Sequence, residues 1–285
     1  MRTELGDQRL RRLIYSYFGD DTRIRVLRPA RTFGAPVFVV DFDRGTRHYR
    51  TLGSFGTQAQ VTEQSTMDLL YPAHLVFHYE RLMSLAFALA EQPLRALLLG
   101  VGGAAMWRFM RAYLPECAPT LVDSDQSVVA IARRWFYLKQ EVVIETAQRF
   151  LAETTHRFDA ILVDLYDAGG PADNGETFWA ECLRALAPGG CLATNWADFA
   201  VNDRVRPMAE AQAEAARAIG LGCFYATRRG FRDNLVQYVP TGALREPEML
   251  TGALERFARD RRIPDRGRGI LENCVITTGF PVSNW

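Results

Sequence analysis

Residues 97–110, LLLGVGGAAMWRFM, are the stretch that decides the fold of this 285-residue chain. A short apolar run ends at Gly100, glycines recur at Gly102 and Gly103, and small residues then begin a helical pattern. A strand, a glycine turn and a helix in this order place a ligand at the carboxyl end of the strand, because glycine has no Cβ to keep the ligand from the backbone. The stretch also fits a tight turn with no ligand, so its surroundings decide its meaning.

Short apolar runs alternate with helical patterns further along the chain. The apolar runs are RALLLG, PTLVD, VVIE, DAILVD and CLATN, and the helical patterns between them are AAMWRFMRAYL, DQSVVAIARRWFYL, TAQRFLAET and ETFWAECLRALAPGG. Wholly apolar strands separated by helices predict βαβ units and a parallel sheet that is buried on both faces. The last two expected strands, CFYAT and NLVQYVP, have a connection so short that they must pair antiparallel.

The first part of the chain has a different periodicity. Residues 1–20 predict a short amphipathic helix, and PVFVVDF and RHYRTLGSF predict two strands joined by a tight turn. Residues 72–91 predict another helix. These patterns predict an N-terminal helix and small β domain (1–62), a main α/β domain (63–242) and a C-terminal extension (243–285).

The composition excludes several classes of function. A net charge of +1 provides no concentrated positive field, so neither nucleic acid nor a membrane surface is expected as a partner. Lys139 is the only lysine and has no glycine loop beside it, which excludes P-loop, Schiff-base and pyridoxal-phosphate chemistry. Five dispersed cysteines without a C-x-x-C pair indicate reduced thiols and a cytoplasmic protein. The sequence predicts neither a signal peptide nor a membrane span.

Two further groups of polar residues are not expected to form functional sites. His74 and His78 are four residues apart, but a catalytic zinc site needs three protein ligands and no third is suggested nearby, so no metal is expected. Arg228, Arg229 and Arg232 lie between the last two expected strands, where they predict a solvated turn.

Acidic residues follow two of the apolar runs. Asp123 lies about twenty residues after the glycines, at a strand end, where a carboxylate can accept both hydroxyl protons of a ribose. Asp125 is predicted to cap the next helix. Asp164 ends the fourth run, and Asp167 follows in a loop rich in Gly, Pro and Asp. Two carboxylates at this edge can hold an amine and take its proton as it attacks an electrophile, although Asp167 also fits a residue that starts a turn.

As a set, LLLGVGGAA, LVDSDQSVV, DAILVDLYDAGGPA and ETFWAECLRALAPGGCLATN resemble the spermidine synthase (polyamine aminopropyltransferase) family. The resemblance covers about residues 35–240 and includes QSTM at 64–67 before a helix that contains Tyr79. It implies an α/β fold of the class I S-adenosylmethionine methyltransferase (Rossmann-like) type behind a small β-hairpin domain. It also implies an enzyme that moves an aminopropyl group from decarboxylated S-adenosylmethionine to a polyamine such as putrescine, without a metal and as a homodimer.

The resemblance also implies roles for individual residues. Asp164 would orient and deprotonate the amine, Tyr79 and Asp167 would lie in the amine pocket, and residues 165–175 would form a gating loop. The residues that it implies for donor binding are Gln64, Gly100, Gly102, Gly103, Asp123, Glu145 and Thr146.

Two acids of the family pattern are missing. The family's glycine loop carries an aspartate that faces the charged propylamine end of the donor, and Gly103 or Ala104 stands in its place. The family's acid near the adenine aligns with Glu145-Thr146-Ala147, where Thr146 replaces it and Glu145 substitutes only in part. Loss of an acid that pairs with a cationic amine removes about 1.5–3 kcal/mol. The chain is therefore expected to be a divergent member whose acceptor amine, or even donor, has changed.

Three alternatives stay open. A methyltransferase that uses S-adenosylmethionine itself is favoured by the missing loop acid, because an acid there would repel the donor's carboxylate. A catalytically silent nucleoside-binding or scaffold protein would keep Asp123 and the glycines without amine-dependent turnover. An NAD-dependent dehydrogenase is the weakest alternative, because the Asp164 region and the expected antiparallel last strand do not fit that class of enzyme.

Overall fold

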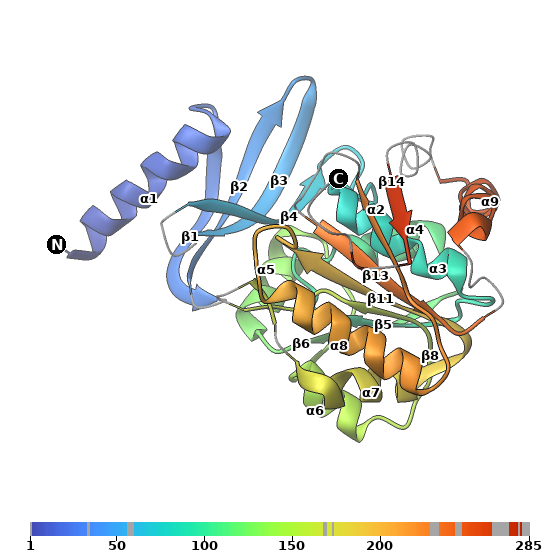
Figure 1. The fold of residues 1–285 in the computed structure, drawn as a ribbon. Helices are drawn as coiled ribbons and strands as arrows, with labels where there is room; N and C mark the ends of the chain where they lie inside the picture. Colours follow the sequence, from blue (N-terminus) through green and yellow to red (C-terminus); the bar gives the residue numbers. More distant parts are fainter. Residues whose placement is uncertain are drawn as a thin grey trace.

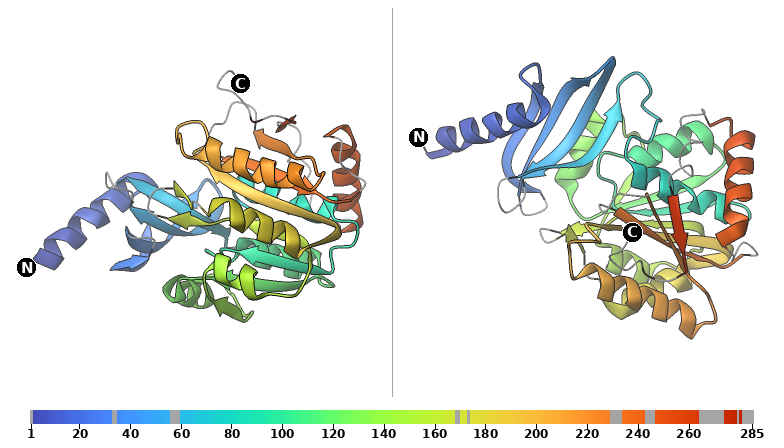
Figure 2. Two further views of the ribbon diagram at one scale, coloured as in Figure 1. Left: turned by 60° about the horizontal axis from the view of Figure 1, so that its bottom comes forward. Right: turned by 45° about the horizontal axis from the view of Figure 1, so that its top comes forward.

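The computed structural model describes residues 2–32, 35–55, 60–167, 170–172, 174–228, 234–242, 247–263, 274–278 and 280. An antiparallel sheet with a long helix at the N-terminus stands beside a larger layered α/β body (Figure 1). Both views in Figure 2 place α1 on the far side of the N-terminal sheet from the α/β body. Within the described ranges, no helix has the length and apolar content needed to cross a membrane.

The N-terminal part is helix α1 (Arg2–Phe18) and a four-stranded antiparallel sheet in chain order, made of β1 (Arg23–Thr32), β2 (Ala35–Arg44), β3 (Arg47–Phe55) and β4 (Val61–Asp68). The predicted hairpin is confirmed, and Gly45 supplies the positive φ of +64° that its turn requires. The sheet runs past residue 62, where the sequence predicted its end, because β4 pairs with β3 as far as Asp68. Polar residues dominate VTEQSTMD, so this strand gives no apolar signal.

The main sheet has eight strands in the order β14-β12-β13-β11-β8-β5-β6-β7. Five strands are parallel, namely β5 (Arg95–Leu99), β6 (Ala118–Asp123), β7 (Val142–Ile144), β8 (Phe158–Val163) and β11 (Leu186–Ala197). The other three pair antiparallel, namely β12 (Phe224–Arg228), β13 (Asn234–Pro240) and β14 (Cys274–Thr277). The predicted α/β class and the antiparallel pair β12–β13 are confirmed.

Helices cover both faces of this sheet, as its apolar strands predict. One apolar cluster packs under α2 (His78–Ser84), α3 (Ala86–Leu89), α4 (Ala105–Tyr113), α5 (Gln126–Trp135) and α9 (Pro247–Asp260). The opposite cluster packs under α6 (Ala147–Glu153), α7 (Gly175–Ala185) and α8 (Val205–Ala218). A two-residue ladder of β9 (Tyr166–Asp167) and β10 (Gly170–Pro171) follows β8.

Two expectations about element boundaries were wrong. The helix expected over residues 72–91 begins only at His78, because the Glu80 carboxylate accepts the Phe77 backbone N–H at 3.1 Å and so caps the helix there. The C-terminal extension is not separate from the main domain throughout, because residues 274–277 form β14 at the edge of the main sheet.

The N-terminal sheet packs on the main domain through helix α5. Apolar side chains of β2, β3 and β4 share one cluster with Val128, Ile131 and Phe136. Arg50 of β3 donates to the Trp135 carbonyl at 3.0 Å, and its guanidinium lies 5.3 Å from the centroid of the Trp135 ring. The opposite face of the N-terminal sheet packs against α1 through Ile14.

Candidate active site

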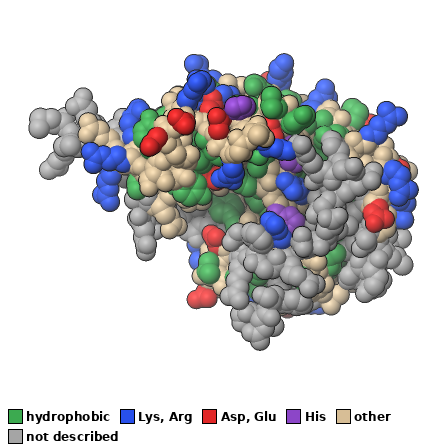
Figure 3. All heavy atoms as spheres, turned by 90° about the horizontal axis from the view of Figure 1, so that it is seen from above, with side chains coloured by type: hydrophobic (Ala, Val, Ile, Leu, Met, Phe, Trp, Pro, Cys, Tyr) green, Lys and Arg blue, Asp and Glu red, His purple; other side chains and the backbone are tan. Residues whose placement is uncertain are grey.

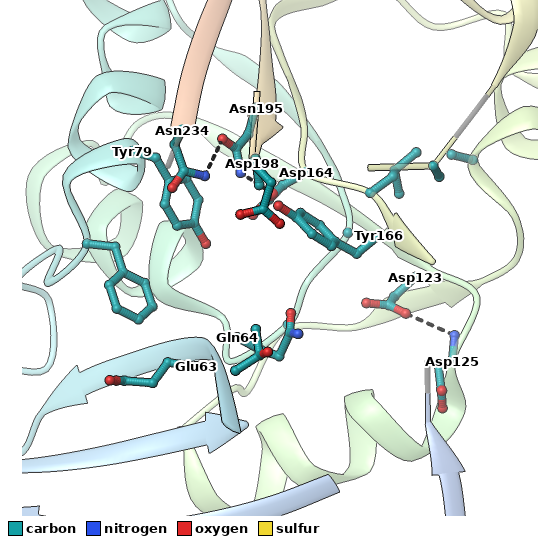
Figure 4. Close-up of a pocket in the computed structure, with 18 of the residues that line it drawn as sticks. Glu63, Gln64, Tyr79, Asp123, Asp125, Asp164, Tyr166, Asn195, Asp198 and Asn234 are labelled. Carbon is teal, nitrogen blue, oxygen red and sulfur yellow. Dashed lines mark hydrogen bonds between the residues drawn. The ribbon is translucent and has the colours of Figure 1, made fainter. Parts of the chain in front are cut away.

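A cavity of about 940 Å3 lies where the carboxyl ends of the parallel strands face the N-terminal sheet. Open parallel sheets bind ligands at this edge. The cavity is lined by most of the residues that the sequence selects, namely Gln64, Tyr79, Gly100, Gly102, Asp123, Glu145, Thr146 and Asp164. In Figure 4 the pair Asp123 and Asp125 lies apart from a group around Asp164, with Tyr166 between them. The cavity therefore has two chemically different ends.

The glycine loop connects β5 with α4 and forms part of the cavity wall. Gly100 has φ +90°, and a Cβ there would lie 2.2 Å from the Asp164 carbonyl oxygen. Only glycine lets the backbone pass this close to the end of β8. Gly102 has φ +49° and nothing within 4 Å of a Cβ, so its backbone borders open space. The loop is thus shaped for close approach of a ligand.

Asp123 ends β6 beside this loop. Its carboxylate accepts the Val101 and Asp125 backbone N–H groups, both at 2.9 Å, and the side chain is 8% exposed. Burial raises the pKa of Asp123, and the backbone hydrogen bonds act in the opposite direction. Asp125 caps α5 as predicted by accepting the Ser127 N–H at 2.8 Å. Asp123 is therefore a fixed acceptor at the end of the cavity where the sequence expects a ribose.

The Asp164 carboxylate lies at the other end, just after β8. Asn195 of β11 donates to it at 2.9 Å, and Asn234 of β13 donates to Asn195 at 2.9 Å (Figure 4). This relay fixes the carboxylate through three adjacent strands. Desolvation raises the pKa of Asp164, while the hydrogen bonds from Asn195 and Tyr79 lower it in part. An oriented carboxylate of raised pKa is suited to take a proton from an amine.

Two tyrosines accompany Asp164. Desolvation and the neighbouring charge of Asp164 raise the pKa of Tyr79 and of Tyr166 well above the usual value. Both phenols therefore stay protonated and serve as hydrogen-bond donors. Phe77 stacks on Tyr79 with ring centroids 5.8 Å apart, which fixes the plane of the phenol.

The remaining predicted site residues differ in position. Gln64 donates to the Ser54 hydroxyl at 3.0 Å, and Thr146 caps α6 by accepting the Arg149 N–H at 3.3 Å. Gly103 lies outside the main cavity and lines a small one of about 50 Å3 behind the loop. The side chain of Asp167 lies outside the described residues, so its role stays a prediction.

Two buried ionisable side chains, Glu80 and Arg108, lie behind the glycine loop, where the family's acid is missing. A Cβ on Gly103 would lie 2.5 Å from the Ser65 hydroxyl, so the loop has no room for a side chain here. Glu80 is 4% exposed, and burial raises its pKa to about 8. Burial lowers the pKa of Arg108 to about 10, and Arg108 donates to the Pro72 carbonyl at 2.7 Å and to the Phe136 carbonyl at 3.1 Å. Arg108, on α4, thereby binds both the segment that precedes α2 and the C-terminal end of α5.

Several cavity residues were not selected from the sequence. They are Glu63, Tyr166, Asn195, Asp198, Arg228 and Asn234. Asn195 lies near the end of a predicted parallel strand. A polar residue at that position is the sequence feature by which Asn195 could have been selected as a site residue. Arg228 was expected in a solvated turn, but it lines the cavity. Its position depends on pairing across β11, β13 and β12, which local sequence does not reveal.

In the described ranges, no three His, Cys, Asp or Glu side chains are grouped to hold a metal.

A mostly parallel sheet with a glycine loop and a strand-end acid defines a Rossmann-like nucleoside-binding fold. A model of the spermine/spermidine synthase domain matches residues 76–239, which is more than half of the chain, and the chain belongs to this family.

Three known proteins illustrate the similarity. The polyamine aminopropyltransferase of Chromobacterium violaceum is 36% identical over 142 residues, which are 47% of this chain and 54% of that protein. The corresponding protein of Neisseria meningitidis serogroup A is 34% identical over 181 residues, 60% of this chain and 65% of that protein. The chain thus matches between half and two thirds of the length of these relatives. A solved probable spermidine synthase from Corynebacterium glutamicum covers 84% of this chain and 93% of its own, with TM-score 0.64 and 19% identity.

Proposed function

We propose that this protein is an aminopropyltransferase that uses decarboxylated S-adenosylmethionine as donor and a small-molecule amine such as putrescine as acceptor. The observation that carries the proposal is the Asp164 carboxylate, held by Asn195 and Asn234 at one end of a cavity whose other end carries Asp123. Family membership and the names of its relatives support the same reaction.

In the proposed reaction the amine nitrogen attacks the propyl carbon next to the donor's sulfonium. The C–N bond forms as the C–S bond breaks, the bonding electrons pass to sulfur, and methylthioadenosine leaves as a neutral thioether. Asp164 orients the amine and accepts its proton, and Tyr79 donates a hydrogen bond beside it. Asp123 binds the ribose hydroxyls, Gln64 and the loop from Gly100 to Gly103 contact the donor's tail, and Glu145 and Thr146 lie by the adenine. The main contribution of the protein is alignment of nucleophile and electrophile.

A methyltransferase is the second candidate, and one observation favours it. Gly103 or Ala104 stands at the loop position where the family carries an acid, and at Gly103 the Ser65 side chain fills the space that a larger side chain would need. Without that acid, nothing at this position of the loop repels the carboxylate of S-adenosylmethionine. The group of Asp164, Asn195 and Tyr79 favours an amine acceptor in either reaction.

Calorimetric titration with decarboxylated S-adenosylmethionine, S-adenosylmethionine and methylthioadenosine separates the candidates. Tighter binding of the decarboxylated donor than of S-adenosylmethionine supports aminopropyl transfer. The reverse order contradicts it and favours methyl transfer. Binding of none of the three contradicts both and leaves a scaffold protein.

The proposal also covers the cellular location and the oligomeric state of the enzyme. The dispersed cysteines support a cytoplasmic protein, and family membership supports a homodimer. Sedimentation analysis of the full chain tests the homodimer, because a single species of about 32 kDa would contradict it.

A further inference from the structure

The small cavity behind the glycine loop adjoins the main cavity. Five residues line both, namely Gln64, Tyr79, Gly100, Gly102 and Asp164. Its volume is about 50 Å3. A water molecule takes up about 30 Å3 in the liquid, so the small cavity has room for one group of that size, such as an ammonium. It is therefore shaped to hold the end of a ligand that lies in the main cavity.

The charge around the small cavity has one sign. Basic and acidic side chains are intermixed at the surface of the face shown in Figure 3. Inside, the ionisable residues that line the small cavity are Glu80, Asp164 and Tyr79, and the phenol of Tyr79 stays protonated. Among the described residues, no arginine, lysine or histidine lines it. A positively charged group fits these surroundings, and a negatively charged group does not.

Helix α2 brings the carboxylate of Glu80 to this cavity. Oε2 of Glu80 accepts the Phe77 backbone N–H at 3.1 Å, and Oε1 takes no part in that cap. The glycine loop cannot supply a carboxylate here from Gly103, because a Cβ on Gly103 would lie 2.5 Å from the Ser65 hydroxyl. An acid on α2 thus reaches the cavity that an acid at this point of the loop could not enter.

Four ionisable neighbours act on Glu80. They are Tyr79 and Arg81 on α2, Arg108 on α4 and Asp164 after β8. The two guanidinium groups lower the pKa of Glu80, but burial outweighs them and the pKa is raised to about 8. Arg108 donates to the Gly103 carbonyl and does not line the small cavity. The ionised form of Glu80 therefore lacks full compensation until another cation enters.

We propose that Glu80 takes the place of the missing loop acid and binds the ammonium of the donor's aminopropyl group inside the small cavity. The inference rests on the proposed function and adds the residue that selects the donor. In S-adenosylmethionine the carbon that bears the amine also bears a carboxylate. That carboxylate would meet Glu80 and Asp164 in a space with room for one small group, so the pocket favours the decarboxylated donor.

Release of a proton is the first consequence to measure. At pH 7 Glu80 of the unliganded protein is mostly protonated, because its pKa is about 8. An adjacent ammonium favours the ionised carboxylate, so decarboxylated S-adenosylmethionine is expected to release about one proton on binding. Methylthioadenosine has no ammonium and is expected to release none. Calorimetric titration at pH 7 in two buffers of different ionisation enthalpy measures the number of protons.

Glu80→Gln is the variant that tests the assignment, because its amide oxygen can still accept the Phe77 N–H. Its affinity for decarboxylated S-adenosylmethionine is expected to fall by about ten- to a hundredfold, and the proton release is expected to disappear. Its affinity for methylthioadenosine should stay within about threefold of the wild type. Glu141→Gln is the matched control, since Glu141 is 95% exposed, and it should bind both ligands as the wild type does.

Three results would overturn the inference. They are unchanged affinity of Glu80→Gln for decarboxylated S-adenosylmethionine, an equal loss in affinity for methylthioadenosine, and proton release that persists in this variant. With any of these results, aminopropyl transfer by the wild type would leave the proposed function in place. If the wild type binds neither decarboxylated S-adenosylmethionine nor methylthioadenosine, the proposed function fails together with the inference.

Discussion

The carboxylate of Asp164 is the group on which the proposed chemistry depends. Its two neighbours hold it by donated hydrogen bonds and leave it able to accept a proton. Asp164→Asn keeps the shape but cannot accept the proton, so kcat is expected to fall by about 10²–10⁴. The Kd of methylthioadenosine should stay within about threefold, because the variant removes an interaction with the amine and not with the nucleoside. An equal loss in nucleoside binding would instead indicate a structural role.

The pH profile of the reaction provides an independent check of Asp164. Its pKa is raised above the usual 3.8, and only the ionised form accepts a proton. We therefore expect kcat/KM to fall as pH decreases through this raised pKa, at a midpoint above that of an exposed aspartate. The acidic limb should be absent from the residual activity of Asp164→Asn. If the acidic limb of the kcat/KM profile were unchanged in Asp164→Asn, the group that titrates there would be a residue other than Asp164.

Glu80 links pH to stability. Its pKa is about 8 in the folded protein against an ordinary value of 4.5. Between these values the folded state keeps a proton that the unfolded state releases, so this group's contribution to stability decreases as pH rises and is fully lost above about 8. Glu80→Gln should gain stability relative to wild type over this interval, by at most about 1.4 kcal/mol per pH unit. Urea unfolding at pH 5 and pH 8 measures the difference, and a constant difference would contradict the raised pKa.

At the residue scale, strand-end reasoning predicts part of the site. Asp123 and Asp164 follow apolar runs, so their convergence at one edge of a parallel sheet is expected. Arg228 and Asn234 reach the same cavity through antiparallel strands, and no local pattern specifies that register. The burial of Glu80 and of Arg108 is likewise a product of packing between α2 and α4.

Among the elements, the glycine loop is the one in which an added side chain is expected to be most costly to stability. Gly100→Ala adds a Cβ that would lie 2.2 Å from the Asp164 carbonyl oxygen, at φ +90°. Gly220→Ala is a matched control with φ +77° and open space around the Cβ. We expect a loss of about 1 kcal/mol in the control and about 3 kcal/mol or more in Gly100→Ala, measured by urea unfolding. Equal losses would show that the loop can move away from Asp164 at no cost.

The elements themselves were largely predictable where burial leaves a periodic pattern. The five apolar runs form the parallel strands, because strands covered on both faces need no polar alternation. The start of α2 was mispredicted because residues 72–77 have helix-compatible composition, whereas Glu80 caps the helix at Phe77 and Arg108 binds the Pro72 carbonyl. Both contacts are specific side-chain bonds that periodicity does not reveal.

On the scale of the whole molecule, the N-terminal sheet and the α/β domain share one apolar cluster around Phe136, which is fully buried. Phe136→Ala should cost about 3–5 kcal/mol. Because the cluster joins both parts, wild-type unfolding by urea should give coincident transitions by tryptophan fluorescence and by circular dichroism. Two separate transitions in the wild type would show that the sheet folds independently.

The proposed function depends on which thioether the protein releases. The deciding measurement incubates the protein with decarboxylated S-adenosylmethionine and an amine, in parallel with S-adenosylmethionine and the same amine, and identifies the products by mass spectrometry. Aminopropyl transfer predicts methylthioadenosine and an aminopropylated amine only in the first reaction, and loss of both products in Asp164→Asn. Release of S-adenosylhomocysteine with a methylated amine in the second reaction, and no product in the first, would contradict it.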